Sequence, residues 1–125
     1  MRGVFKTRYF ARWSAKAGLP DQALCLAVEE MEQGLIDAYL GGGVVKKRVA
    51  LPGRGKRGST RTLLGTNLGD RWFFLYGFEK NQRDNIRNDE LKALCAYAHD
   101  LLAQTPAQLA EGIAAGNLRE ICHEQ

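Results

Sequence analysis

A run of three consecutive glycines, Gly41-Gly42-Gly43, divides the chain into two stretches whose apolar residues repeat with different periods. Before the run, apolar side chains recur every three to four residues, as they do along one side of a helix. This spacing predicts a helix over residues 8–17 after a Thr7 cap, and a second helix that opens at Leu19-Pro20-Asp21. Residues 35–40 are expected to form a short helical extension or a packed loop. After the glycines the apolar residues alternate, as in strands, so the chain combines helices with a sheet.

The second stretch predicts an antiparallel meander of strands. The strands are expected at residues 44–51, 60–66 and 71–78, with the turn Asn67-Leu68-Gly69-Asp70 before the last of them. That last strand is dense in aromatic residues, which predicts a central strand covered on both faces. A short first strand is expected at residues 3–7.

The C-terminal third returns to helical spacing. A helix that begins at Asn88-Asp89 has an apolar stripe and should cover one face of the sheet. Thr105-Pro106 predicts a capped, short helix through Ala115, and residues 118–122 are expected as an edge strand. The predicted fold class is therefore α+β, with N-terminal helices and a C-terminal helix packed on a twisted antiparallel β-sheet.

Length and composition suit one folded domain over residues 1–125. Of the 125 residues, 45% are hydrophobic, which is enough for one core, and no internal repeat or linker is evident. No apolar run reaches the about 18 residues of a membrane-spanning helix, and the first residues lack the apolar stretch of a secretory signal. These features predict a cytoplasmic protein.

The three cysteines, Cys25, Cys95 and Cys122, are odd in number and widely spaced. Such a pattern predicts neither a disulfide framework nor a zinc site. Cys25 and Cys95 fall among apolar residues with helical spacing, which is typical of a cysteine that packs as a small hydrophobic residue.

Positive charge is concentrated in one segment of the chain. Seven basic residues and no acidic residue lie from Lys46 to Arg61, whereas the whole chain has 18 basic and 14 acidic residues. The rest of the chain therefore contains more acid than base. A positive field confined to one segment is what a localised site for a polyanion requires.

Some of these cations are expected on one face of a hairpin. Lys46 and Arg48 point to the same side of a strand, and the antiparallel return can bring Arg61 beside them. Like charges crowded on one face are destabilising, which favours a bound anion. Two other interpretations are a solvated hairpin whose cations discourage edge pairing and a surface that docks an acidic protein. The glycine-rich loop at residues 53–58 lacks the ending of a nucleotide-binding loop and suits an extended nucleic-acid strand better.

A set of motifs follows one another from Gly41 to Asn85. They are the glycine run, Lys46-Lys47-Arg48-Val49-Ala50, the basic glycine loop, Arg61, and the segment from Trp72 in which Tyr76-Gly77 precedes Lys80-Asn81. In this order and spacing the motifs resemble the HigB-like (RelE-type) branch of the RelE/ParE toxin superfamily. The resemblance implies a RelE-like fold and the toxin of a type II toxin-antitoxin system. It also implies an antitoxin partner, expected to be a helix-turn-helix protein, and ribosome-dependent cleavage of mRNA.

That activity requires no metal or cofactor, and we expect none. RNA carries its own nucleophile, the 2′-hydroxyl, so a protein can promote cleavage by orienting the chain and stabilising charge on the phosphate. Arginine suits this task because its planar fork can donate two hydrogen bonds to phosphate oxygens. The candidate catalytic residues are Lys46, Arg48, Arg61, Lys80 and Arg83. The candidate RNA-binding residues are Lys47, Arg54, Lys56 and Arg57.

Two positions depart from the pattern of some RelE-type enzymes. Where those enzymes have an arginine directly after the strand-end lysine and a tyrosine further along, this chain has Asn81 and Arg87. A proton donor to the leaving oxygen is therefore not evident. This departure favours an alternative function, either a non-catalytic nucleic-acid-binding module or a ParE-like inhibitor of DNA gyrase.

Overall fold

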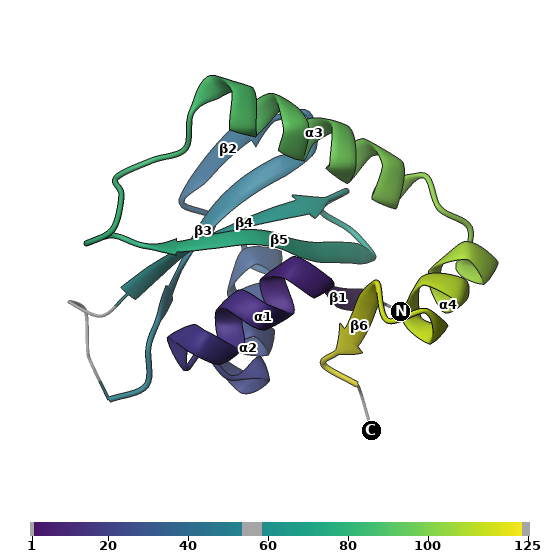
Figure 1. Cartoon of the computed structure of the whole chain (residues 1–125), viewed down its shortest axis with the longest axis horizontal. Helices are drawn as coiled ribbons and strands as arrows, with labels where there is room; N and C mark the ends of the chain where they lie inside the picture. The colour runs from purple at the N-terminus through teal and green to yellow at the C-terminus, as the bar shows by residue number, and fades with distance from the viewer. Residues whose placement is uncertain (1, 54–58, 124–125) are drawn as a thin grey trace.

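A computed structural model describes residues 2–53 and 59–123 of the chain, and Figure 1 shows its helices on both faces of a sheet. In chain order the elements are β1 (Gly3–Thr7), α1 (Arg8–Ala17), α2 (Asp21–Glu32), β2 (Ala38–Gly41), β3 (Val44–Ala50), β4 (Ser59–Thr66), β5 (Arg71–Glu79), α3 (Asn88–Leu102), α4 (Pro106–Ala114) and β6 (Leu118–Ile121). Across residues 2–53 and 59–123, no helix combines the length and the hydropathy of a membrane-spanning segment. The expected α+β class is confirmed.

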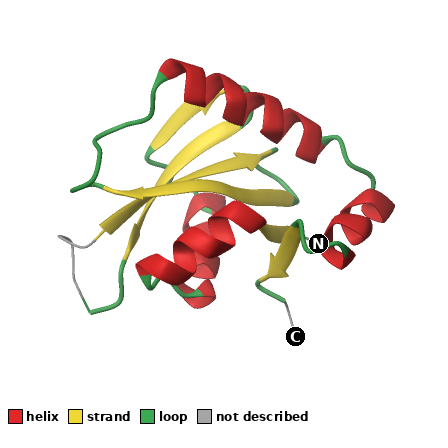
Figure 2. Ribbon diagram, viewed as in Figure 1, coloured by secondary structure: helices red, strands yellow, loops and turns green. Residues whose placement is uncertain are grey.

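The sheet has six strands in the order β2-β3-β4-β5-β1-β6, and its meander β3-β4-β5 is antiparallel, as predicted. β1 lies between β5 and β6 and runs parallel to β5, whereas β6 is an antiparallel edge strand. β5 is a central strand with helices above and below it (Figure 2), and its aromatic residues Trp72, Phe73 and Phe74 are fully buried. The aromatic-rich sequence thus marks the strand that both layers of helices cover.

Two hydrophobic clusters hold the layers together. On one face, Phe10 of α1 and Val28 of α2 pack with Phe74 of β5, and on the other face Ala98 of α3 packs with Phe73. The approach of α3 is close at Gly65, where an added Cβ would lie 2.7 Å from the Cβ of Ala98. Glycine is therefore required at this position by packing rather than by backbone conformation.

The helical elements follow the local signals of the sequence closely. Thr7 caps α1 by accepting a hydrogen bond from the Phe10 amide, and Thr105 caps α4 with Pro106 in the first turn. These two helices begin where the cap and proline signals predict, because a cap satisfies amide groups that otherwise have no partner.

The expectation for residues 35–40 was partly wrong. Ala38 and Tyr39 are strand residues of β2, paired with Lys46 and Val45 of β3. The glycines supply the turn of this hairpin, with φ angles of 60° at Gly42 and 80° at Gly43, a region that glycine enters without steric cost. The glycine run therefore reverses the chain as well as ending the helical region.

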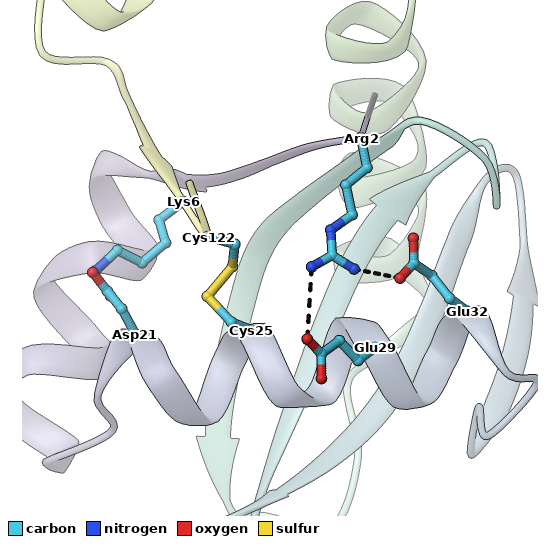
Figure 3. The surroundings of a disulfide bond; sticks show 7 residues. All are labelled: Arg2, Lys6, Asp21, Cys25, Glu29, Glu32 and Cys122. Carbon is cyan, nitrogen blue, oxygen red and sulfur yellow. Dashed lines mark hydrogen bonds and ion pairs between the residues drawn. A yellow bond between two sulfur atoms is a disulfide. The ribbon is translucent and has the colours of Figure 1, made fainter. Parts of the chain in front are cut away.

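The prediction that no disulfide is present was also wrong, because Cys25 of α2 is bonded to Cys122, which follows β6. The two residues are 97 positions apart in the chain, and their Cα atoms lie 5.5 Å apart. In Figure 3 the bond lies beside the ion pair between Lys6 of β1 and Asp21 of α2. Pairing of β6 with β1 brings Cys122 over α2, and this long-range approach is not encoded in the cysteine spacing. Cys95 is a free, half-buried cysteine.

Candidate functional site

The register of β3, β4 and β5 aligns two arginines and an aromatic residue across one face of the sheet. Arg48 is paired with Arg61, and Arg61 with Phe78. Directly opposed residues in an antiparallel sheet point to the same face, with neighbouring strands about 4.8 Å apart. Phe78 belongs to the cluster packed under α3, so the row lies on the α3 face. In Figure 1 the C-terminal ends of β3 and β5 and the N-terminal end of β4 extend beyond the N-terminal end of α3.

A second row on the same face adds a lysine and a tyrosine. Lys46 of β3 is paired with Leu63 of β4, which is paired with Tyr76 of β5. Lys46 and Tyr76 are half-buried, whereas Arg48 in the first row is exposed. The structure therefore brings Lys46, Arg48 and Arg61 to one face, as the alternation of β3 predicts. We call this set, together with Tyr76 and Phe78, the cationic face.

Arg61 is the most buried cation of the cationic face, with 8% of its surface exposed. Its guanidinium donates a hydrogen bond of 3.1 Å to the hydroxyl of Ser59. Within residues 2–53 and 59–123, no carboxylate lies within ion-pair distance of it. Arginine is seldom this buried unless its charge is paired, because desolvation disfavours a bare cation. An anion bound at this face would supply the missing partner.

Arg83 lies beside this face but has its own intramolecular partner. Its guanidinium donates to Glu90 at 2.6 and 3.1 Å and to the Tyr76 hydroxyl at 3.1 Å. It also lies over the ring of Phe78, 5.7 Å from the centroid. The hydrogen bonds between Arg83 and Glu90 lower the pKa of Glu90 to about 2. The same bonds raise the pKa of Arg83 above its ordinary value. Arg83 was predicted to clamp phosphate, but in the structure its charge is balanced and it holds Tyr76 in position.

The remaining candidate residues lie elsewhere. Lys80 is exposed in the turn after β5. Lys47 points to the opposite face, where it is buried, donates to the Leu35 carbonyl at 2.8 Å and pairs with Glu30 at 3.1 Å. The alternation of the strand places it there, so the predicted grouping of Lys47 with the RNA-binding residues does not match its position. The candidates Arg54, Lys56 and Arg57 lie outside the described residues.

Sequence reasoning missed Glu90 and Tyr9. Glu90 stands at the third position of α3 and accepts from the Arg87 amide as part of a capping box. The capping role of Glu90 can be recognised in the sequence, but its hydrogen bonds with Arg83 cannot. Tyr9, in the first turn of α1, stacks on Tyr76 with ring centroids 5.7 Å apart. That contact joins segments distant in the chain and carries no local signal.

Fold and site together define a small α+β protein with an incompletely covered sheet face that carries cations and aromatic side chains. The sequence matches the family model described as "RelE toxin of RelE / RelB toxin-antitoxin system" over residues 1–121. The chain therefore belongs to this toxin family, and the expected RelE-like fold is confirmed. No curated protein matches the chain.

Proposed function

We propose that this chain is a ribosome-dependent mRNA endoribonuclease of the HigB-like branch, the toxin of a type II toxin-antitoxin system. The observation that carries the proposal is Arg61, a buried cation without a carboxylate partner in the described part of the chain, in one row with Arg48. A phosphodiester bound over this row would balance both charges. Family membership supports the toxin role, and the exposed side chain of Arg48 in this row is accessible to a nucleic-acid strand.

The chemistry requires only groups that RNA, these side chains and solvent water supply. The 2′-hydroxyl attacks the adjacent phosphorus and gives up its proton, the bond to the 5′-oxygen breaks, and that oxygen takes a proton from solvent water, so that a cyclic phosphate and a 5′-hydroxyl result. Arg61 and Arg48 would stabilise the negative charge that builds up on the phosphate oxygens, since arginine donates charged hydrogen bonds in a planar fork. Lys46 on the neighbouring row is our candidate for the group that receives the 2′-hydroxyl proton, a role open to its neutral amine form, which then returns the proton to solvent water.

The proposed partners follow from the same role. Membership of the family implies an antitoxin, and we propose a helix-turn-helix protein in that role. An acidic segment of the antitoxin would bind the cationic face by charge complementarity and block access of mRNA. The proposed site of action is the ribosome, in the cytoplasm.

The direct test is an Arg61→Ala variant in a translation reaction with purified protein and a defined message. We expect wild-type protein to cleave the message and the variant to cleave it about 10²- to 10³-fold more slowly, because one preorganised charge donor is removed. Cleavage rates are measured by separating end-labelled message fragments. Arg12→Ala, which removes an exposed arginine from α1, is the matched control and should cleave at the wild-type rate.

Thermal unfolding of Arg61→Ala separates a lost clamp from a lost fold. The midpoint should change far less than the cleavage rate, because the Arg61 side chain donates one hydrogen bond within the described residues. An intact message at all concentrations of wild-type protein contradicts the proposal. If DNA supercoiling by gyrase is then inhibited, the ParE-like alternative holds, since a ribonuclease leaves that reaction unaffected.

A further inference from the structure

A pair of stacked tyrosines lies at the edge of the cationic face and has no part in the chemistry above. Tyr9 of α1 and Tyr76 of β5 have ring centroids 5.7 Å apart and an interplanar angle of 10°. The pair forms where β1 ends, because β1 is paired with β5 only as far as Phe74. Beyond that point the first turn of α1 takes the place of a neighbouring strand. We refer to Tyr9 and Tyr76 as the tyrosine shelf.

The shelf offers an aromatic surface to solvent. Tyr9 is 57% exposed although its ring is stacked on Tyr76. Hollows adjoin both rings: Tyr9 lines one of about 330 Å³ together with Tyr97, and Tyr76 lines one of about 200 Å³ together with Leu94. An exposed aromatic ring flanked by shallow hollows is the kind of surface on which a planar group can stack.

The shelf is held in a defined position. The hydroxyl of Tyr76 accepts a hydrogen bond from Arg83. Arg83 in turn donates two hydrogen bonds to the carboxylate of Glu90, which fixes its position. Partial burial, with Tyr76 as a further cause, raises the pKa of Tyr9, so its phenol stays neutral and does not repel phosphate. A preorganised ring loses little conformational entropy when a ligand stacks on it.

Tyr76 also connects the shelf to the cations. It lies in the same row as Lys46 of β3, and Arg83 bridges from its hydroxyl to the ring of Phe78 in the row of Arg61. A polyanion that lies across these rows would therefore reach the shelf. Single-stranded RNA combines phosphates with planar bases, and proteins that bind it pair cations with aromatic platforms in this way.

We propose that Tyr9 and Tyr76 form a stacking site for an unpaired nucleobase of the RNA strand whose phosphate is held by Arg61 and Arg48. The inference rests on the proposed function and deepens it, because it assigns a subsite for a base next to the phosphate. Arg83 and Glu90 are positioning residues of this subsite. A base stacked on Tyr9 would fix the rotation of the strand over the cationic face.

The test is binding of fluorescent 2′-O-methyl RNA, which lacks the nucleophilic hydroxyl, measured by anisotropy at low ionic strength. Tyr9→Leu should weaken binding by about 5- to 100-fold, the range for loss of one base-aromatic stack. Tyr9→Phe should bind like the wild type, because the ring is retained. Tyr39→Leu is the matched control: Tyr39 is 64% exposed but lies on the edge strand β2, and its loss should leave binding unchanged.

An RNA of the same length with abasic nucleotides separates stacking from a general disturbance of the site. Wild type and Tyr9→Leu should bind it equally, because no base remains to stack. An equal loss on the normal and the abasic RNA overturns the shelf, as does unchanged binding of Tyr9→Leu to normal RNA. An acidic peptide with aromatic residues is the third ligand, and a loss by Tyr9→Leu for this peptide alone overturns the inference in favour of a protein partner.

The two proposals fail in different ways. Message cleavage that depends on Arg61 but not on Tyr9, together with unchanged RNA binding by Tyr9→Leu, leaves the proposed function intact and removes the shelf. Absence of RNA binding by the wild-type chain also overturns the shelf, whereas the proposed function is judged by cleavage in the translation reaction.

Discussion

Arg61 and Lys47 are both buried cations on neighbouring strands, and their surroundings give them different roles. Lys47 is neutralised by Glu30 and hydrogen-bonded to a carbonyl under α2, so it stabilises the contact of α2 with the sheet. Arg61 lies on the other face and has only a hydroxyl as its hydrogen-bond acceptor in the described residues. The alternation of side chains in β3 and β4 separates these two environments. Whether a cation packs under α2 or lies on the cationic face therefore depends on which of the two alternating positions of its strand it occupies.

At this scale the pair formed by Arg83 and Glu90 makes a pH-dependent prediction. Glu90 has a pKa of about 2 in the folded chain, below its ordinary value of 4.5. A lowered pKa stabilises the fold while the carboxylate is charged, so this contribution is complete above about pH 5 and is lost as pH falls from 4.5 to about 2. Glu90→Gln keeps a capping side chain but removes the charge.

We expect wild type to be more stable than Glu90→Gln at neutral pH, with the difference in free energy of unfolding shrinking towards zero near pH 2. Urea unfolding at a series of pH values measures it. The difference should not vary between pH 6 and 8. A difference that grows as the pH is lowered from 5 to 2 would contradict the assigned pKa.

The packing of α3 on the sheet decides how much of the cationic face is covered. Gly65 lets α3 approach β4 until Ala98 lies against the strand, and Gly77 lets the ring of Trp13 from α1 rest on the other face. The helix layers are thus set by two strand glycines, each opposite a side chain of a helix. Since α3 also carries Glu90, its position determines where Arg83 and Tyr76 lie.

Gly65→Ala tests this packing. The added methyl group would overlap Ala98, so we expect the free energy of unfolding to fall by about 1–3 kcal/mol, as for overpacked cores. Gly69→Ala is the matched control, because its Cβ would meet nothing nearer than 3.6 Å. Denaturant unfolding followed by circular dichroism compares the two variants. Equal stability of Gly65→Ala and the wild type would show that α3 can shift without cost.

For the molecule as a whole, β1 and β6 join the two ends of the chain to one edge of the sheet. β1 is parallel to β5 and antiparallel to β6, and the disulfide between Cys25 and Cys122 attaches the end of β6 to α2 (Figure 3). The bond closes a loop that spans most of the chain. A cross-link of this length is expected to stabilise the fold mainly by restricting the unfolded chain.

Removal of the disulfide makes a prediction for the whole molecule. The double variant Cys25→Ser with Cys122→Ser should lose about 2–4 kcal/mol of unfolding free energy relative to oxidised wild type. The loss should vanish when both proteins are measured with excess dithiothreitol, because the wild type then lacks the bond as well. Cys95→Ser, at the free cysteine, is the control: it keeps the bond between Cys25 and Cys122 and should lose stability with reductant as the wild type does. Insensitivity of wild-type unfolding to the reductant would contradict the bond.

Much of the fold could be predicted because its signals are local. The caps at Thr7 and Thr105, the aromatic strand at residues 71–78 and the alternation of β3 each depend on neighbours in the chain. The same alternation predicted the shared face of Lys46 and Arg48. Residues 38–41 were harder, because a strand of four residues that runs into a glycine turn gives too short a pattern to distinguish from a loop.

Local signals were enough to predict the α+β class, most of the elements, and the grouping of cations on one hairpin, since periodicity and capping act over a few residues. Three features became known from the three-dimensional fold alone: the parallel pairing of β1 with β5, the bond between Cys25 and Cys122, and the contacts of Tyr76 with Tyr9 and Arg83. The physical reason is that each of these joins residues whose approach depends on how whole elements pack, and packing is decided by burial of both sheet faces at once.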